Sequence, residues 1–256
     1  MNKNICKLCG NVFSDDEMSE EHYPARSVGN NDIVLFDVVK MFDYVTAFGE
    51  KEALSKAELQ SPNDETFEKC VVKNLYPQGR TARTLCKDCN QFLGKYDKAY
   101  LKFFKVNGDP NIVKGFSKQT KLNIIKAIYG KFLSVPEAAG EKFDFLDFIK
   151  NVESESYNGD WNLYFIKRDY TTDIMGIPDI GTGKETFDDG IVYEMSDEKF
   201  IFNLLNFKKH DSFVMTNIFE ILNKNYSVVE GVSGKGSYHE SIFLSRMFKQ
   251  MHENKE

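Results

Sequence analysis

The fold is decided around residues 86–103, which read CKDCNQFLGKYDKAYLKF. The apolar side chains of this stretch recur at helical spacing and form one face: Phe92, Tyr96, Ala99, Tyr100 and Phe103. This periodicity predicts a helix that starts near Lys87 and ends before the turn-forming residues 107–110, which read NGDP. A pair of cysteines, Cys86 and Cys89, therefore stands where the helix begins.

A second Cys-x-x-Cys pair, Cys6 and Cys9, precedes the first, and 76 residues separate Cys9 from Cys86. Four thiolates are the ligand set of a structural Zn²⁺ that keeps no open position. In a reducing compartment, a metal explains paired cysteines better than disulfides do. The fifth cysteine, Cys70, is predicted to be a small buried hydrophobic residue.

The long segment between the two pairs does not argue against zinc. The free energy of closing a loop grows with the logarithm of its length, so two doublings beyond the usual spacing cost about 1.2 kcal/mol. Zinc binding to such sites contributes on the order of 10–16 kcal/mol. The sequence therefore predicts one zinc ion held by Cys6, Cys9, Cys86 and Cys89.

The net charge of −6 over 256 residues hides a basic middle segment. Residues 1–66 carry a net charge of −7 and residues 137–256 carry −9, whereas residues 67–136 carry +10. The basic segment surrounds the second cysteine pair. A local basic surface is what an acidic protein needs in order to bind a nucleic acid.

The chain carries no sequence feature of a membrane or secreted protein. No stretch approaches the roughly 18 consecutive apolar residues that a membrane helix needs. The first residues enter the Cys6 motif directly, without the apolar segment of a signal peptide. We therefore expect a cytoplasmic protein with no membrane partner.

Three further sequence features lie between the cysteine pairs or next to them. Glu21-His22-Tyr23-Pro24 lies between the cysteine pairs, Gly29-Asn30 follows it, and Asn90 comes directly after Cys89. Together with the cysteines, these residues resemble the HNH, or ββα-metal, family of nucleases. The resemblance is to the endonuclease VII-like branch, which has an asparagine after its last cysteine, and it covers about residues 5–100.

The resemblance implies an active site that hydrolyses phosphodiester bonds. His22 is the implied general base, since an imidazole accepts a proton near neutral pH. Glu21 and the amide oxygen of Asn90 are the implied ligands of a catalytic Mg²⁺ or Mn²⁺. Asn30 is the residue implied to orient His22, with Asn31 and Asn74 as alternatives for that role.

Basic residues flank these motifs and are candidates for binding phosphate. Lysines at positions 95, 98, 102 and 105 recur on one face of the predicted helix, away from its aromatic face. The candidates are Arg26, Arg83, Lys87, Lys95, Lys98, Lys102 and Lys105, with Arg80 nearby. Surface salt bridges to the acidic amino-terminal segment are an equal alternative for the arginines and Lys95.

The remaining sequence predicts further helices and strands. Helices are expected at residues 117–133, from Pro136 to about Val152, and at about 211–223 and 238–252. Strands are expected at Trp161–Tyr170, Gly190–Met195 and Lys199–Phe207. We therefore expect an α+β fold. A zinc-stapled HNH module with a long insert would occupy residues 1–109, and a mixed helical and antiparallel-sheet region residues 110–256.

The expected function is that of a metal-dependent endonuclease acting on nucleic acid, with DNA favoured over RNA by the resemblance. Residues 110–256 carry no catalytic motif and are expected to select or present the substrate. The alternative is a non-catalytic zinc-knuckle module that binds nucleic acid or protein and keeps a vestigial site.

Overall fold

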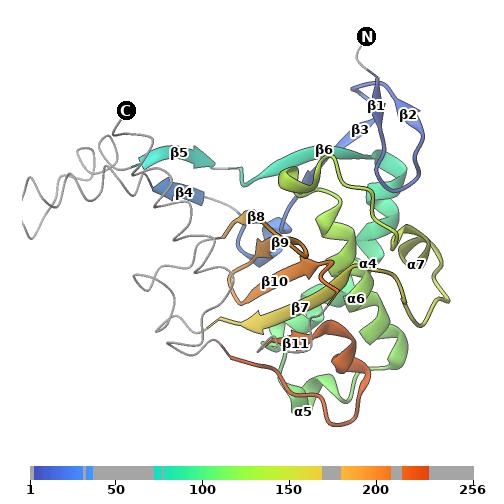
Figure 1. Ribbon diagram of the computed structural model, residues 1–256, viewed down its shortest axis with the longest axis vertical. Coiled ribbons are helices and arrows are strands. Elements are labelled where there is room, and N and C mark those ends of the chain that lie inside the picture. Colours follow the sequence, from blue (N-terminus) through green and yellow to red (C-terminus); the bar gives the residue numbers. More distant parts are fainter. Residues whose placement is uncertain are drawn as a thin grey trace, which may run out of the picture. The chain divides into compact units, whose positions relative to one another are not determined.

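The computed structural model describes residues 3–30, 33–36, 72–76, 78–168, 180–208 and 215–230 (Figure 1). The chain divides into two compact units, Met1–Asn30 with Arg80–Ile242 and Asn31–Gly79 with Phe243–Glu256. In the second unit, β4 (Ile33–Phe36) pairs with β5 (Val72–Tyr76) in antiparallel fashion. The elements that follow all belong to the first unit.

The amino-terminal cysteines lie in a small hairpin, in which β1 (Asn4–Ile5) pairs with β2 (Val12–Phe13). The N–H of Gly10 donates to the carbonyl of Cys6 at 2.8 Å, and the N–H of Cys6 donates to the carbonyl of Asn11 at 2.9 Å. Gly10 has a φ of 78°, a left-handed conformation that glycine adopts without strain. The turn can therefore be tight enough to bring both cysteines to one side.

A two-stranded antiparallel sheet leads directly into the longest described helix. β3 (Met18–His22) pairs with β6 (Thr81–Cys86), and α4 (Lys87–Lys105) starts immediately after β6. A register shift between Ser19 and Glu21 leaves an extra residue in β6. The bounds of α4 confirm the helix predicted from the periodicity of residues 86–103.

The next helix packs against α4. After α5 (Pro110–Val113), α6 (Lys118–Phe132) begins at Ser117, whose Oγ accepts the N–H of Thr120 at 3.2 Å. This confirms the helix predicted at residues 117–133.

The helix predicted from Pro136 to about Val152 is wrong. Only a 3-10 turn, η2 (Pro136–Ala138), and a short helix, α7 (Leu146–Lys150), form in this segment. Phe143 and Phe145 are both buried, and their rings stack with centroids 4.6 Å apart. Side chains two positions apart share a face only where the backbone is extended, so the packing of this aromatic pair interrupts the helix.

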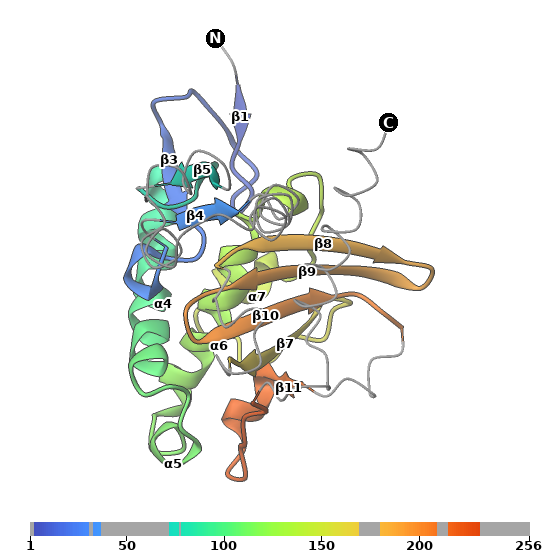
Figure 2. The same ribbon diagram turned by 90° about the vertical axis from the view of Figure 1, so that its left-hand side faces the viewer.

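The carboxyl-terminal part of the first unit contains a five-stranded antiparallel sheet with the order β11-β7-β10-β9-β8 (Figure 2). The strands are β7 (Asn162–Lys167), β8 (Thr182–Phe187), β9 (Gly190–Ser196), β10 (Phe200–Leu205) and β11 (Thr216–Asn217). Three of them, β7, β9 and β10, form where strands were predicted. The sequence did not reveal β8, because TGKETF lacks an apolar alternation.

The helix predicted at about 211–223 is also wrong for the residues that the structure describes. They form β11 and a 3-10 helix, η4 (Ile218–Leu222). Thr216 and Asn217 pair with β7. Their backbone groups are therefore engaged in the sheet and are not available for the hydrogen bonds of an α-helix. The helix predicted at about 238–252 lies outside the described residues.

The core joins α4 to the sheet. The ring of Phe103 lies with its centroid 5.0 Å from that of Phe200 and 5.9 Å from that of Phe165. The boundary predicted between residues 109 and 110 therefore lies inside the first unit. Among the described helices, none has both the length and the apolar character needed to cross a membrane.

Candidate functional site

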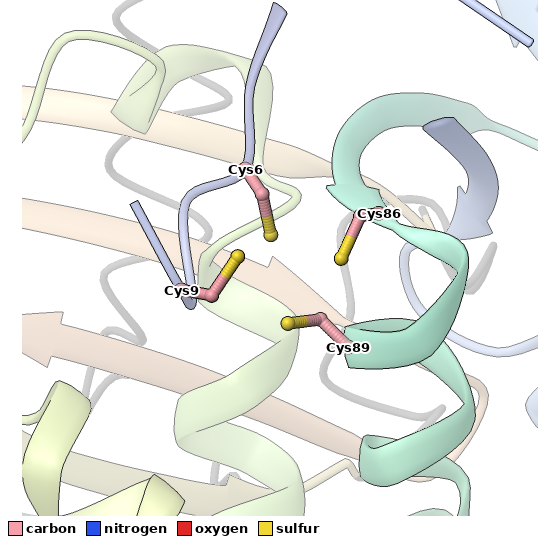
Figure 3. A group of neighbouring side chains, drawn as sticks. All are labelled: Cys6, Cys9, Cys86 and Cys89. Atoms are coloured by element: carbon pink, nitrogen blue, oxygen red, sulfur yellow. The ribbon is translucent and has the colours of Figure 1, made fainter. Parts of the chain in front are cut away.

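The four cysteines come together at the start of α4 (Figure 3). Cys6 and Cys9 come from the loop between β1 and β2, Cys86 ends β6, and Cys89 lies in the first turn of α4. Their Sγ atoms all lie within 4.8 Å of one another. This confirms the predicted four-cysteine cluster.

The cluster is compatible with structural zinc. A Zn–S distance of about 2.3 Å places the sulfurs of a tetrahedral site roughly 3.8 Å apart, so a small contraction would complete it. Four thiolates leave no position for water or substrate, and such an ion holds the fold together rather than reacting. Within the described ranges, no other group of three or more histidine, cysteine or acidic side chains has this geometry.

The surroundings of Cys6 favour the thiolate that zinc requires. Burial raises the pKa of the Cys6 thiol, but hydrogen bonds from the backbone of Cys9, Cys86 and Leu8 outweigh burial and bring the pKa below its ordinary value. Burial raises the pKa of the Cys9 and Cys89 thiols. Because zinc binds thiolates, its binding is expected to release protons from this cluster.

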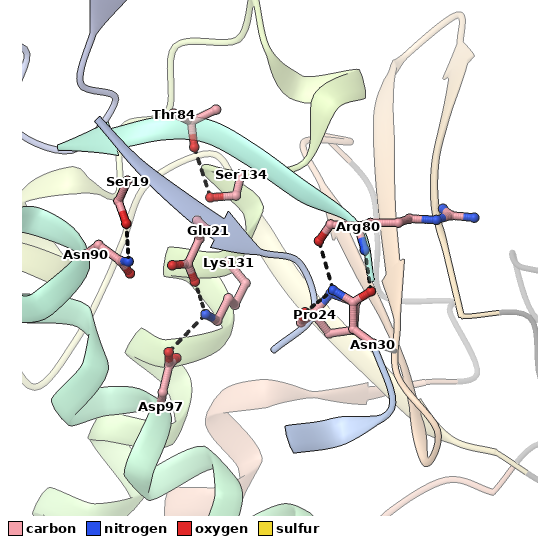
Figure 4. Close-up of polar contacts among 10 residues, drawn as sticks. All are labelled: Ser19, Glu21, Pro24, Asn30, Arg80, Thr84, Asn90, Asp97, Lys131 and Ser134. Atoms are coloured by element: carbon pink, nitrogen blue, oxygen red, sulfur yellow. Dashed lines mark hydrogen bonds and ion pairs between the residues drawn. The ribbon is translucent and has the colours of Figure 1, made fainter. Parts of the chain in front are cut away.

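Glu21 lies against a lysine that the sequence analysis did not single out. Its carboxylate forms an ion pair with the ammonium of Lys131, which also lies 2.9 Å from Oδ2 of Asp97 (Figure 4). Glu21 comes from β3, Asp97 from α4 and Lys131 from α6. Only 5% of the surface of Glu21 is exposed, so solvent screens these charges little.

The pKa values of this cluster reflect burial and mutual attraction. Burial lowers the pKa of the Lys131 ammonium, but the carboxylates of Asp97 and Glu21 outweigh burial and raise it above its ordinary value. Burial raises the pKa of Glu21, and the charge of Lys131 acts against that rise. Lys131 therefore stays protonated between the two carboxyl groups.

Asn90 lies in the first turn of α4 and faces the same strand. Its Nδ2 donates to Oγ of Ser19 at 2.6 Å, which leaves Oδ1 as the acceptor of the amide. The structure thus brings both predicted ligands of the catalytic metal, Glu21 and Asn90, to the interface of β3 and α4. Each of the two has a protein partner there.

His22 is the last residue of β3, pairs with Thr81 of β6 and is half-buried. Successive residues of a strand point to opposite faces, so His22 is placed on the face away from Glu21. The predicted base and the predicted carboxylate ligand are therefore neighbours in sequence on different faces of the two-stranded sheet.

Asn30 is fully buried and binds backbone groups close to His22. Its Nδ2 donates to the carbonyls of Pro24 at 2.6 Å and Arg80 at 2.9 Å, and its Oδ1 accepts the N–H of Arg80 at 2.7 Å. These bonds tie the loop after β3 to the start of β6. The role predicted for Asn30, orienting His22, stays a prediction, and these bonds offer a route for it through the backbone.

The predicted lysine face of α4 is exposed, with one correction. Lys98, Lys102 and Lys105 are exposed, as is Lys87 at the start of the helix. The Nζ of Lys95, however, lies 3.7 Å from the ring centroid of Phe92 and 4.8 Å from that of Tyr96. The expectation that all four lysines lie away from the aromatic face is therefore wrong for Lys95.

The arginines differ in their surroundings. Nη2 of Arg83 lies 3.3 Å from Oε1 of Glu20, and both side chains are exposed. For Arg83, the surface salt bridge that the sequence left open as an alternative is present. Arg26 is exposed at the start of η1 (Arg26–Val28), and Arg80 is half-buried beside Asn30.

Asp97 and Lys131 are the site residues that sequence reasoning missed. Lys131 lies between Gly130 and Phe132, in a part of α6 that is buried on all sides. A lysine within a continuous apolar segment needs hydrogen-bond acceptors from elsewhere in the fold, either carboxylates or backbone carbonyls. That requirement was the one sequence feature that could have identified Lys131.

Comparison with known proteins found no family model, no curated protein and no solved structure that matches this chain. The site is therefore interpreted from its own geometry and from its residue types.

Proposed function

We propose that this chain is a metal-dependent endonuclease that hydrolyses phosphodiester bonds in nucleic acid, with DNA as the favoured substrate. One observation carries the proposal. The antiparallel pair of β3 and β6 leads straight into α4, and the cysteine cluster lies where α4 begins. Glu21 and His22 lie on β3, the strand that contacts α4 at Asn90. This is the order of elements that the HNH resemblance implies.

In this proposal His22 takes the proton from the attacking water, which requires the backbone at the end of β3 to turn its imidazole toward the site that Glu21 faces. Asn30 is a positioning residue, because its hydrogen bonds hold the backbone on either side of the His22–Thr81 pair. Glu21 and Asn90 would hold Mg²⁺ or Mn²⁺, which when bound supplies positive charge to the phosphate oxygens of the transition state.

The donor atoms suit a hard cation. Carboxylate and amide oxygens are ligands that Mg²⁺ prefers, and the bond from Asn90 to Ser19 leaves the amide oxygen available for this role. One carboxylate oxygen of Glu21 is paired with Lys131, so a cation that binds Glu21 competes with the ammonium for this carboxylate.

The exposed lysines of α4 support a polyanionic substrate. Lys98, Lys102 and Lys105 lie on the helix that also carries Asn90. A net acidic chain must offer such a local basic surface if a nucleic acid is to reach its site.

A second function, that of a non-catalytic binding module, is favoured by a different observation. Glu21 and Asn90 have protein partners in Lys131 and Ser19, so the fold satisfies these side chains without a divalent cation. In that case the zinc knuckles present a surface for nucleic acid or protein, and the HNH-like residues no longer cleave.

Cleavage of plasmid DNA by zinc-loaded protein in the presence of Mg²⁺ or Mn²⁺ tests the proposal. His22→Ala should lower the cleavage rate by a factor on the order of 10²–10⁴, because the general base is lost. Glu21→Ala and Asn90→Ala should instead raise the metal concentration that cleavage requires. Zinc content should stay at the wild-type level in all three variants.

His252→Ala is a matched control, since the sequence assigns no role to that histidine. If His22→Ala cleaves at the wild-type rate, the assigned base is wrong. If wild-type protein binds nucleic acid but cuts neither DNA nor RNA with either metal, the binding module is the better description.

A further inference from the structure

Lys131 reaches the candidate site from a part of the chain that the HNH resemblance does not cover. It lies near the end of α6, and its ammonium contacts carboxylates from β3 and α4, those of Glu21 and Asp97 (Figure 4). Its side chain is only 11% exposed. The positive charge of Lys131 thus lies beside Glu21, where the proposed divalent cation has to bind.

Another buried lysine of α6 shows what a purely structural lysine looks like in this fold. The Nζ of Lys126 donates to the carbonyls of Asn151 at 2.7 Å and Val152 at 2.9 Å. Those acceptors are uncharged backbone groups that fasten the chain after α7 to α6. Lys131 has two carboxylates instead, and carboxylates are the groups that bind hard cations.

The surroundings of Lys131 carry excess negative charge, and the adjacent face of α4 is open at Gly94. Two carboxylates share one ammonium, so the cluster still attracts a cation. Asn90, Gly94 and Asp97 follow one another at helical spacing and lie on one face of α4. A Cβ at Gly94 would meet no atom within 4 Å, so this glycine leaves room between the amide and the carboxylate.

We propose that Lys131 is the resident counter-ion of the candidate site and competes with a divalent cation for Glu21 and Asp97. This inference rests on the proposed function, because it assigns the cation to Glu21. Lys131 holds the two carboxylates together before a cation binds, and it raises the cation concentration at which the site fills. The ammonium keeps its proton when it is displaced, so Lys131 is a positioning residue and takes no part in bond making.

Binding of Mn²⁺ to the zinc-loaded full chain, followed by the electron paramagnetic resonance of free Mn²⁺, tests this competition. Lys131→Met should bind Mn²⁺ about tenfold more tightly than wild type, because the ammonium that pairs with both carboxylates no longer repels the cation. Lys126→Met is the matched control. It also removes a buried lysine from α6 and should keep the wild-type affinity.

A double variant shows whether the higher Mn²⁺ affinity of Lys131→Met depends on Glu21. In Lys131→Met combined with Glu21→Gln, the tighter binding should disappear, because the carboxylate freed by the first change is removed by the second. The proposal is overturned if Lys131→Met binds Mn²⁺ no more tightly than wild type, or if the gain survives in the double variant.

Lys131→Gln covers the case in which Lys131→Met does not fold, since its amide still donates hydrogen bonds to the carboxylates without a charge. It should also bind Mn²⁺ more tightly than wild type. If both variants stay unfolded with and without Mn²⁺, Lys131 is only a structural ion-pair residue and the proposal is wrong. If Mn²⁺ binding behaves as expected and no variant cleaves DNA, the counter-ion role stands and the endonuclease is rejected.

Discussion

The two polar centres beside α4 differ in where their positive charge comes from. The four cysteines of the first centre, Cys6, Cys9, Cys86 and Cys89, are compatible with a structural zinc ion, which would supply the positive charge for their thiolates. The carboxylates of the second centre, Glu21 and Asp97, already share an ammonium from the chain, that of Lys131. One helix therefore carries a cysteine cluster suited to a metal ion at its start and, further along, a carboxylate cluster that an ammonium of the chain neutralises only in part.

This difference implies different roles for the two cations. A zinc ion at the cysteines would be required for folding, whereas a cation at the carboxylates would not. A site that needs an external ion couples folding to metal binding. A site with an internal counter-ion can fold first and exchange that counter-ion afterwards, at a cation concentration that the competition sets. We therefore expect the two centres to respond differently to chelators, to pH and to substitution.

Loss of zinc should have the largest effect. Cys86→Ser, or removal of zinc by a chelator, should lower the free energy of unfolding by several kcal/mol, since zinc binding on the order of 10–16 kcal/mol is also folding energy. Metal analysis should find one zinc per chain in wild type, and thermal unfolding should report the loss.

Cys70→Ser is the matched control for this comparison, because Cys70 belongs to neither Cys-x-x-Cys pair. It should keep the zinc content of wild type, whereas Cys86→Ser should lose zinc. Well-folded wild-type protein that contains less than about half an equivalent of zinc would contradict the metal assignment, and with it the contrast between the two centres.

Neutralising the lysine face of α4 should have the next largest effect. This variant tests whether nucleic acid binds beside the carboxylate centre. Replacing Lys98, Lys102 and Lys105 together by Gln should weaken nucleic-acid binding about tenfold and similarly for all sequences. The slope of log affinity against log salt should flatten by about 0.9 for each phosphate that the variant no longer neutralises. Lys95 is left in place because its Nζ packs on Phe92.

The control triple variant replaces three exposed lysines in turns and loops, Lys114, Lys142 and Lys224, and changes the net charge by the same amount. It should keep a salt slope close to that of wild type. If the slope flattens equally in the two triple variants, the effect comes from overall charge, and α4 is not the binding surface.

Another buried carboxylate, that of Asp197, is held without a lysine and should make the stability of the fold depend on pH. Its Oδ1 accepts the N–H groups of Lys199 and Phe200 at 2.8 Å each, and its Oδ2 accepts the hydroxyl of Tyr100. Burial nevertheless raises the pKa of Asp197 to about 6. The folded state therefore holds this proton more tightly than the unfolded chain, in which an aspartate has a pKa near 3.9.

The stabilising contribution of this proton is complete below about pH 4 and is lost as the pH rises to about 6. Asp197→Asn keeps an acceptor for the backbone N–H groups and removes the titration. Between pH 5 and pH 7, its free energy of unfolding should therefore rise relative to wild type by about 1 kcal/mol. Urea unfolding of zinc-loaded protein at both pH values measures this difference, and a constant difference would contradict the raised pKa.

The sequence was a good guide where neighbouring residues decide the structure. The helical period after Cys86 and the spacing of the cysteines predicted α4 and the cysteine cluster, because both depend on local geometry or on a shared metal ligand set. The α+β class and three strands of the sheet followed in the same way from apolar and β-branched segments.

Packing between distant elements could not be predicted. Lys131 lies 110 residues from Glu21, and only the packing of α6 against α4 brings their charges together. The helix expected after Pro136 failed for the same reason, since Phe143 packs on the distant rings of Trp161 and Tyr193 and this packing overrides local helix propensity. The roles of Glu21, His22 and Asn90 rest on chemistry that packing alone does not reveal, so they stay predictions.

Gly94→Ala should have the smallest effect on stability and the most informative sign. Gly94 lies on α4 between Cys89 and Asp97, and thus between the two centres. Because a Cβ at this position meets no atom within 4 Å, alanine should raise the free energy of unfolding by about 0.5–1 kcal/mol through its higher helix propensity. If the open space serves substrate or cation at the carboxylate centre, the same change should lower cleavage or Mn²⁺ affinity while it stabilises the fold.

Gly130→Ala of α6 is the matched control, since its Cβ would lie 3.3 Å from Cδ2 of Leu93 and should bring no such gain in stability. A Gly94→Ala variant that is more stable and unchanged in cleavage and Mn²⁺ binding would show that the space beside the carboxylates has no functional use.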